Sequence, residues 1–248
     1  MRTIKITLQY DGGRYDGWQR QGNTDQTIQG KLEGILEKMA GFPVEVRGAG
    51  RTDAGVHALG QTADFKVPDS FVPDEVMDYL NRYLPEDIQV LEAEEKDGRF
   101  HSRLNAVSKI YRYVIETGVR KDVFERKYVY GLGNALDIQA MKKAASYLVG
   151  EHDFKSFCAN KKMKKSTVRN IYSIDIEEKG SKVILTFKGN GFLYHMVRII
   201  TGTLIETGLG KRHADDVKRI LAAGNREEAG FTAPAEGLFL VEVNYTKG

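Results

Sequence analysis

The sequence contains one cysteine, Cys158, in 248 residues. A single thiol excludes an internal disulfide framework and an all-thiolate metal site. The first residues run directly into a strand-like pattern, without the apolar core of a signal peptide. With 41% hydrophobic and 29% charged residues, the composition is that of a globular chain, neither disordered nor membrane-spanning. We therefore expect a cytoplasmic protein in which Cys158 is incidental.

Motifs of several common enzyme classes are also missing. The five histidines show no metal-ligand spacing such as His-x-x-x-His, so we expect no metal site. No glycine-rich segment ends in the Gly-Lys-Ser/Thr of a phosphate-binding loop or matches the dinucleotide fingerprint. There is no nucleophile elbow for a Ser-His-Asp or Cys-His site.

Charge is balanced over the whole chain but not within it. The 37 Lys and Arg residues nearly cancel the 34 Asp and Glu residues. Residues 1–105 contain 13 basic and 18 acidic residues, whereas residues 106–248 contain 24 and 16. An acidic half joined to a basic half indicates a polyanionic partner that is bound mainly by the second half.

Hydrophobic periodicity predicts helices and strands in a similar order in both halves. No long linker separates 1–105 from 106–248, so we expect two closely packed α+β modules of the ferredoxin-like or RNA-recognition type. Thr24 and Asp25 are expected to cap the first helix. The expected strands are at about 3–10, 43–48, 60–67, 87–94, 110–117, 170–178, 182–188 and 238–245. The expected helices are at about 28–39, 73–83, 137–149, 192–208 and 213–223.

The loop at 48–58 has the densest set of reactive groups. It combines small residues with Arg51, Asp53 and His57 between two expected strands, and such a loop lets the backbone approach a ligand closely. Asp53 is either a turn residue that bonds its own backbone, or a nucleophile or general base. Arg51 and His57 favour the chemical role, because donors around a carboxylate keep it ionised at neutral pH. We also expect His57 to contact the substrate.

A second candidate segment, from Arg99 to Tyr113, contains no acidic residue. Interleaved basic and aromatic residues are typical of a surface that contacts RNA phosphates and bases. In the strand expected at 110–117, Tyr111 and Tyr113 lie on one face and Arg112 on the other. Tyrosines in strands are commonly core residues, but the basic neighbourhood favours Tyr111 as a base-stacking residue and Arg112 as a substrate contact.

Arg198 is the only formally charged residue between Gly189 and Ile205, in a helix apolar enough to be buried. A buried guanidinium needs a partner. Either its side chain reaches the surface, or it pairs with a loop carboxylate from the other half, for which Asp53 is the obvious choice.

Residues 154–174 form a further segment without acids. It is either a solvated loop or an arm that contacts phosphates and explains much of the positive charge of the second half. Its clustered lysines are Lys161, Lys162, Lys164 and Lys165.

Six short motifs, in this order, resemble those of the TruA family of tRNA pseudouridine synthases. The resemblance extends over essentially the whole chain, and the block around Asp53 is its most specific part. The motifs are Tyr-Asp-Gly at 10–12, Gly-Trp-Gln-Arg-Gln at 17–21, Gly-Arg-Thr-Asp-Ala-Gly-Val-His-Ala at 50–58, Tyr-Arg-Tyr at 111–113, Phe-Leu-Tyr-His-Met-Val-Arg at 192–198 and Ala-Pro-Ala-Glu-Gly-Leu at 233–238.

The resemblance implies an enzyme that isomerises uridine to pseudouridine at positions 38 to 40 of the tRNA anticodon stem-loop, without metal or organic cofactor. It implies the pseudouridine synthase fold, with two α+β halves whose sheets join around a central catalytic cleft, and a homodimer that binds tRNA. Asp53 matches the catalytic aspartate, Tyr111 the tyrosine that stacks on the target base and Arg198 the arginine that pairs with the aspartate. Arg51 matches the arginine that holds the place of the flipped nucleotide. Gly13-Arg14-Tyr15 and Lys109 depart from the usual family residues.

Two other functions remain open from the residues alone. A non-catalytic RNA-binding protein with two RNA-recognition modules would display several exposed strand aromatics and would not need Asp53. A metal-dependent nuclease would need clustered carboxylates, which the motifs lack.

Overall fold

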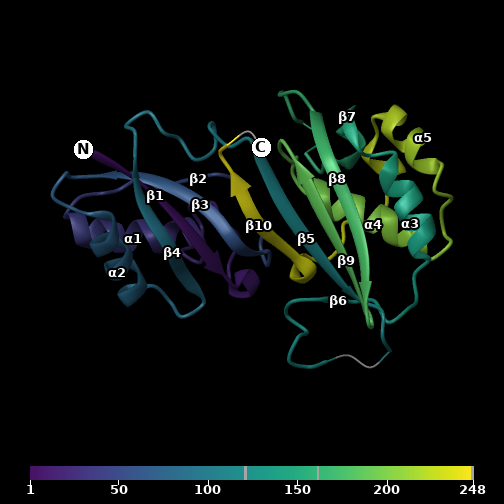
Figure 1. Ribbon diagram of the computed structural model, residues 1–248, viewed down its shortest axis with the longest axis horizontal. Helices are drawn as coiled ribbons and strands as arrows, with labels where there is room; N and C mark the ends of the chain where they lie inside the picture. Colours follow the sequence, from purple (N-terminus) through teal and green to yellow (C-terminus); the bar gives the residue numbers. More distant parts are fainter. Residues whose placement is uncertain (120–121, 161, 247–248) are drawn as a thin grey trace. The chain divides into compact units, whose positions relative to one another are not determined.

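The computed structural model describes residues 1–119, 122–160 and 162–246 (Figure 1). The chain has an α+β fold, as expected, and forms two compact units. One comprises Met1–Val107 with Phe239–Gly248, and the other comprises Ser108–Leu238. This division differs from the boundary at 105/106, because the last strand joins the first unit.

The first unit contains the strands β1 (Arg2–Tyr10), β2 (Arg47–Gly48), β3 (His57–Val67), β4 (Ile88–Lys96) and β10 (Leu238–Asn244), and the helices α1 (Ile28–Ala40) and α2 (Pro73–Tyr83). Its strand order is β4-β1-β3-β10, and β2 also pairs with β3. β1 is antiparallel to β3 and β4, whereas β10 runs parallel to β3. α2 packs against β4 and α1.

Alternating burial confirms β1 as a half-buried strand. Ile4, Ile6 and Leu8 have no exposed surface, which fits side chains two residues apart on one face. The strand expected at 60–67 is longer than predicted, because β3 begins at His57. It therefore starts four residues after Asp53.

Two local predictions in this unit were wrong. Thr24 and Asp25 do not cap α1; the cap is Thr27, whose side chain accepts a hydrogen bond from the Gly30 amide. The strand expected at 43–48 is reduced to the two residues of β2. Side chains of α1, and not a neighbouring strand, bind the backbone of Val46. Gln29 donates to the Val46 carbonyl at 3.0 Å, and Glu33 accepts from the Val46 amide at 3.1 Å.

The second unit contains the strands β5 (Ser108–Glu116), β6 (Tyr130–Gly131), β7 (Gly150–Asp153), β8 (Val168–Lys179) and β9 (Lys182–Gly189), and the helices α3 (Ile138–Ser146), α4 (Met196–Gly208) and α5 (Asp216–Ala223). Its strands lie in the order β5-β9-β8-β7, antiparallel throughout, with β6 parallel to β5. α3 packs against α4 and β8. The sequence did not predict the short strands β6 and β7.

α4 is the buried helix that the apolar run predicted, but it starts later. We expected it from residue 192, whereas it begins at Met196. The preceding residue, His195, has φ of 60°, which is outside the right-handed helical region. Across the three described ranges, no helix combines the length and apolar character needed to cross a membrane.

Candidate active site

The Asp53 loop is fixed by residues from the start of the chain. The Tyr10 and Thr52 hydroxyls lie 2.8 Å apart, and the Trp18 amide donates to the Thr52 carbonyl at 3.0 Å. Tyr10, Trp18 and Thr52 are all buried, with 2 to 6% of their surface exposed. The first three motifs of the sequence therefore meet at Thr52, the residue next to Asp53.

Close backbone approach explains two glycines near this loop. Gly17 has φ of 95°, and a Cβ there would lie 2.7 Å from the Thr52 carbonyl oxygen. A Cβ on Gly48 would lie 2.4 Å from the Trp18 ring. Any side chain at either position would displace the segments that hold the loop.

Asp53 lies at the start of a tight turn and is half-buried. The Val56 amide donates to the Asp53 carbonyl at 3.1 Å, and Gly55 supplies the positive φ of 77° that this turn requires. The Gly55 amide donates to the Tyr15 carbonyl at 3.3 Å. Backbone contacts on both sides thus limit the positions that the Asp53 carboxylate can reach.

The two polar neighbours of Asp53 differ in exposure. Arg51 is exposed, and its Nε donates to Gln19 Oε1 at 2.9 Å. His57 is only 1% exposed, and its ring stacks on Phe239 with centroids 4.8 Å apart. This burial favours a supporting role for His57 over direct contact with a substrate, and its role in substrate binding stays a prediction.

His57 also anchors the segment that follows β1. Its Nδ1 lies 3.1 Å from the Gly12 amide and 3.1 Å from Asp11 Oδ1. Nδ1 accepts from Gly12 when the ring is neutral, and would donate to Asp11 when it is protonated. In either state, the histidine ties the Asp53 loop to Asp11 and Gly12.

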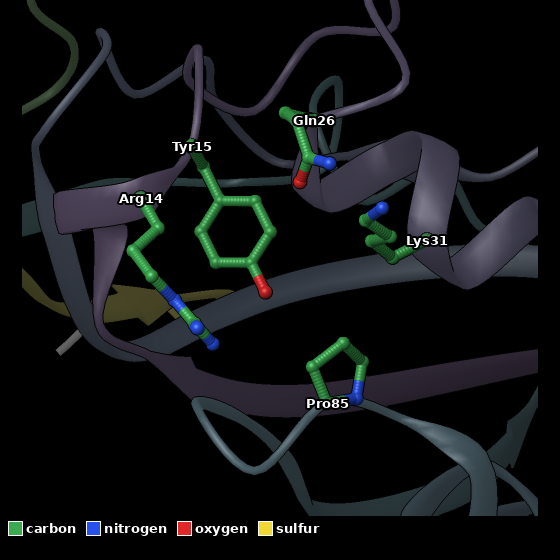
Figure 2. A pocket seen from close by; sticks show the side chains of 5 residues that line it. All are labelled: Arg14, Tyr15, Gln26, Lys31 and Pro85. Carbon is green, nitrogen blue, oxygen red and sulfur yellow. The ribbon is translucent and has the colours of Figure 1, made fainter.

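A cavity of about 370 Å³ lies beside this segment, lined by Arg14, Tyr15, Gln26, Lys31 and Pro85 (Figure 2). Figure 2 shows the Tyr15 ring between Arg14 on one side and Gln26 and Lys31 on the other. Asp87 accepts from the Tyr15 hydroxyl and from Arg14 Nε, at 2.6 and 2.9 Å. Arg14 and Tyr15 therefore share one carboxylate here.

In the second unit, Tyr111 is 7% exposed and contacts Phe192 edge to face, with ring centroids 5.1 Å apart. Tyr113, on the same face of β5, is fully buried, and its hydroxyl donates to the Pro234 carbonyl at 2.8 Å. Burial raises the pKa of Tyr113, as does the charge of Glu236. The face that the sequence assigned to Tyr111 and Tyr113 is thus largely covered by protein.

Arg198, in the first turn of α4, is half-buried, and its Nε donates to the Ala233 carbonyl at 2.7 Å. The Ala233 amide returns a bond to the Arg198 carbonyl at 3.0 Å. A Cβ on Gly237 would lie 2.8 Å from the Tyr113 ring. The three motifs of the second half therefore meet in one unit. Sequence reasoning missed Ala233 as the acceptor for Arg198; the motif at 233–238 was the available signal.

The remaining predicted substrate contacts lie in different places. Arg112 lies on the face of β5 opposite Tyr111. Its charge acts on Glu177, whose pKa is lowered mainly by Lys179 and further by Arg112. Three lysines of the basic segment, Lys162, Lys164 and Lys165, are exposed. The fourth, Lys161, lies outside the described residues.

Asp53 belongs to the first unit, whereas Tyr111 and Arg198 belong to the second. The pairing of Asp53 with Arg198 therefore stays a prediction. Within the described parts of the chain, no group of three or more His, Cys, Asp and Glu residues is arranged to hold a metal ion.

Comparison with known proteins identifies the family. A family model described as tRNA pseudouridine synthase matches residues 6–105 and 144–246. A protein named tRNA pseudouridine synthase A, from Bacillus sp. (strain KSM-64), is 48% identical over 99% of this chain and 100% of its own length. A Bacillus cereus (strain ZK / E33L) protein named tRNA pseudouridine synthase A 2 is 45% identical over the same shares.

Among solved structures, a Cbf5-Nop10-Gar1 complex matches with a TM-score of 0.36 and 11% identity over 82% of this chain and 45% of that chain, a likeness too slight to add to the assignment. The sequence matches extend over the Asp53 loop, the Arg198 helix and the motif at 233–238. The chain belongs to the tRNA pseudouridine synthase family.

Proposed function

We propose that this protein isomerises uridine to pseudouridine in tRNA, at positions 38 to 40 of the anticodon stem-loop. Family membership supports tRNA as the substrate, and the resemblance of all six motifs to the TruA family supports the anticodon arm. The reaction exchanges the N1–C1′ bond of uridine for a C5–C1′ bond. Its substrate and product are isomers, so side chains alone can supply the chemistry.

The observation that carries the proposal is the placement of Asp53. It lies on a turn whose backbone is bonded to Tyr15, next to a Thr52 that is bonded to Tyr10 and Trp18. A carboxylate held in this way can act as a nucleophile and form a covalent intermediate. It attacks either ribose C1′ or uracil C6.

Either attack requires the uridine to leave its stack, which costs a few kcal/mol and less in a loop than in a stem. We propose that Tyr111 contacts the extruded base and that exposed Arg51 fills the place it leaves. Arg198 pairs with Asp53 in this scheme. The bond from Arg198 Nε to the Ala233 carbonyl restricts the guanidinium, and a two-pronged contact with a carboxylate needs an oriented guanidinium.

Binding of the tRNA backbone falls to the basic second half. Lys162, Lys164 and Lys165 are exposed, as phosphate contacts must be. Arg112 and the undescribed Lys161 are proposed to act with them. We also propose a homodimer, on the resemblance to the family; sedimentation equilibrium would give twice the chain mass, and a monomer that retains full activity would contradict it.

Incubation of the protein with an unmodified tRNA transcript, followed by carbodiimide labelling and primer extension, tests the reaction and maps the site. We expect pseudouridine at positions 38 to 40 with the wild type and none with Asp53→Asn, while the variant still binds tRNA because phosphate contacts supply most of the affinity. Arg198→Lys should also be inactive, since an ammonium cannot replace the guanidinium fork.

The same experiment separates the alternatives. Binding without pseudouridine by the wild type would favour a non-catalytic RNA-binding protein. Shortened RNA that disappears when a chelator is added would favour a metal-dependent nuclease. Full activity of Asp53→Asn would overturn the nucleophile assignment.

A further inference from the structure

The backbone is strained directly before α4. Among the described residues, His195 is the one non-glycine residue with a positive φ, at 60°. This conformation costs about 1–3 kcal/mol and is found where the surrounding structure enforces it, often at functional sites. Histidine is one of the residue types that tolerate it best. The strain thus marks the residues next to His195 as a candidate functional site.

Tyr194 is exposed in a segment in which Leu193 and Met196 are buried. Its exposed fraction is 55%, compared with 6% for Leu193 and 0% for Met196. The Tyr194 ring stacks on the His195 ring, with centroids 3.8 Å apart and planes inclined by 30°. One face of the tyrosine is therefore supported by protein while more than half of the residue is open to solvent. An aromatic ring held in this way loses little freedom when a ligand stacks on it.

The backbone of Tyr194 is joined to the basic segment at 154–174. The Ala159 amide, which belongs to this segment, donates to the Tyr194 carbonyl at 3.1 Å. Residues 154–174 contain no acid. Phe192, two residues earlier, contacts the Tyr111 ring. Exposed aromatic rings beside basic side chains are typical of sites that bind single-stranded nucleic acid.

We propose that Tyr194 is a second base-stacking residue, which receives an unpaired nucleotide of the anticodon loop next to the target uridine. This inference rests on the proposed function. Tyr111 is only 7% exposed, so it offers little ring surface for an additional base. Tyr194 offers an open ring in the same unit. Because every base has a π-face, this contact is tolerant of sequence and suits a loop that differs between tRNAs.

The test measures binding of an anticodon stem-loop RNA in an Asp53→Asn background, where no turnover occurs. We expect Tyr194→Ala to weaken binding about 5-fold to 150-fold, as removal of one stacked base does. Tyr194→Phe should bind within about twofold of the parent, since it keeps the ring. The salt dependence should keep its slope in Tyr194→Ala, because every phosphate contact remains in place.

Tyr83→Ala is the matched control. Tyr83 is 56% exposed and its ring also contacts a neighbouring aromatic side chain, that of Tyr79, at 4.7 Å between centroids. It lies in the first unit, at the end of α2, and we expect its removal to leave binding unchanged. Tyr194→Gln keeps a long side chain without a ring and serves as a second variant should Tyr194→Ala fail to fold. It should weaken binding as much as alanine does.

The outcomes separate this inference from the proposed function. If the wild type forms pseudouridine and Tyr194→Ala binds the RNA as tightly as its parent, the stacking role is wrong. Equal weakening in Tyr194→Phe would assign the effect to the hydroxyl, and a shallower salt slope would assign it to phosphate binding; either would overturn the inference. Failure of the wild type to form pseudouridine would contradict the proposed function instead.

Discussion

The hydroxyl of Tyr10 lies 2.8 Å from the hydroxyl of Thr52, and both residues are buried. Tyr10→Phe removes one partner and leaves the Thr52 hydroxyl unsatisfied, which costs about 1–3 kcal/mol of stability. We expect slower pseudouridine formation as well, because Asp53 follows Thr52 directly. Urea unfolding and single-turnover assays measure the two effects. Tyr79→Phe is the control; equal effects in both variants would contradict a specific role for Tyr10.

Tyr10 should also make stability sensitive to alkaline pH. Burial raises the pKa of Tyr10 from 10.0 to about 12. Between these values the unfolded chain releases the phenol proton and the folded chain keeps it, so the free energy of unfolding falls as pH rises. Each pH unit in this window lowers it by about 1.4 kcal/mol for this group.

Below pH 10 the group is protonated in both states and has no such effect. The pKa values of Tyr15, Tyr113 and Tyr245 are also raised, chiefly by burial, so they add to the destabilisation at high pH. Urea unfolding between pH 9 and 12 would show it. Tyr10→Phe should have a shallower dependence than Tyr79→Phe, and identical slopes would contradict the prediction.

A buried ion pair should matter more than an exposed one. The Asp64 side chain is fully buried; it accepts from Arg47 Nε at 2.9 Å and from the Ser102 amide at 2.7 Å. Arg47→Met leaves this carboxylate without its charged partner, which should cost about 3 kcal/mol. In contrast, the Arg14 side chain is 65% exposed, and its partner Asp87 also accepts from the Tyr15 hydroxyl, so Arg14→Met should cost clearly less. Thermal and urea unfolding would measure the loss of stability in each variant. Similar losses in Arg47→Met and Arg14→Met would contradict the prediction.

Alanine should have opposite effects at two glycines. At Gly17, φ is 95° and a Cβ would meet the Thr52 carbonyl, so Gly17→Ala should destabilise the protein by about 2 kcal/mol and lower activity. At Gly34, within α1, no atom lies within 4 Å of the position of a Cβ. Gly34→Ala should therefore stabilise the protein by about 0.5–1 kcal/mol without altering activity. A stable, fully active Gly17→Ala would contradict the close approach.

The basic segment at 154–174 should contribute to the salt dependence of tRNA binding. Replacement of Lys162, Lys164 and Lys165 by alanine should weaken binding at low salt. The slope of log K against log salt should become shallower by about 0.7–0.9 for each phosphate that is no longer neutralised. Lys31, Lys38 and Lys66 of the first unit provide a control of equal charge. Equal slopes for the two triple variants would show that the segment has no special role.

Regular periodicity predicted much of the fold. β1, α2 and β9 lie close to their expected ranges, because each has a repeating buried face. β8 also lies close to its expected range, although only Ile171 and Ile176 of this strand are buried. The prediction of a strand at 43–48 was wrong because of residues that lie outside this range. Gln29 and Glu33, from another element, bond the Val46 backbone that a neighbouring strand would otherwise pair.

The sequence singles out the candidate site residues, whose roles stay predictions, but it does not predict the contacts that hold them. Composition directed attention to Asp53, Tyr111 and Arg198. The hydrogen bonds around them join positions far apart in sequence, such as Tyr10 with Thr52 and Arg198 with Ala233. Hydrophobic periodicity could not predict the positive φ of His195, because this angle is seen only in the backbone of the structure.

The parallel pairing of β10 with β3 also has a consequence for how the protein is made. His57 lies opposite Phe239, and a Cβ on Gly60 would come within 2.5 Å of the Val241 carbonyl oxygen. The start of β3, next to the Asp53 loop, therefore cannot pair with β10 until the whole of the second unit has been synthesised. Pairings across such sequence separations form slowly. Until then the start of β3 lacks this partner, and unpaired strand edges favour aggregation during synthesis.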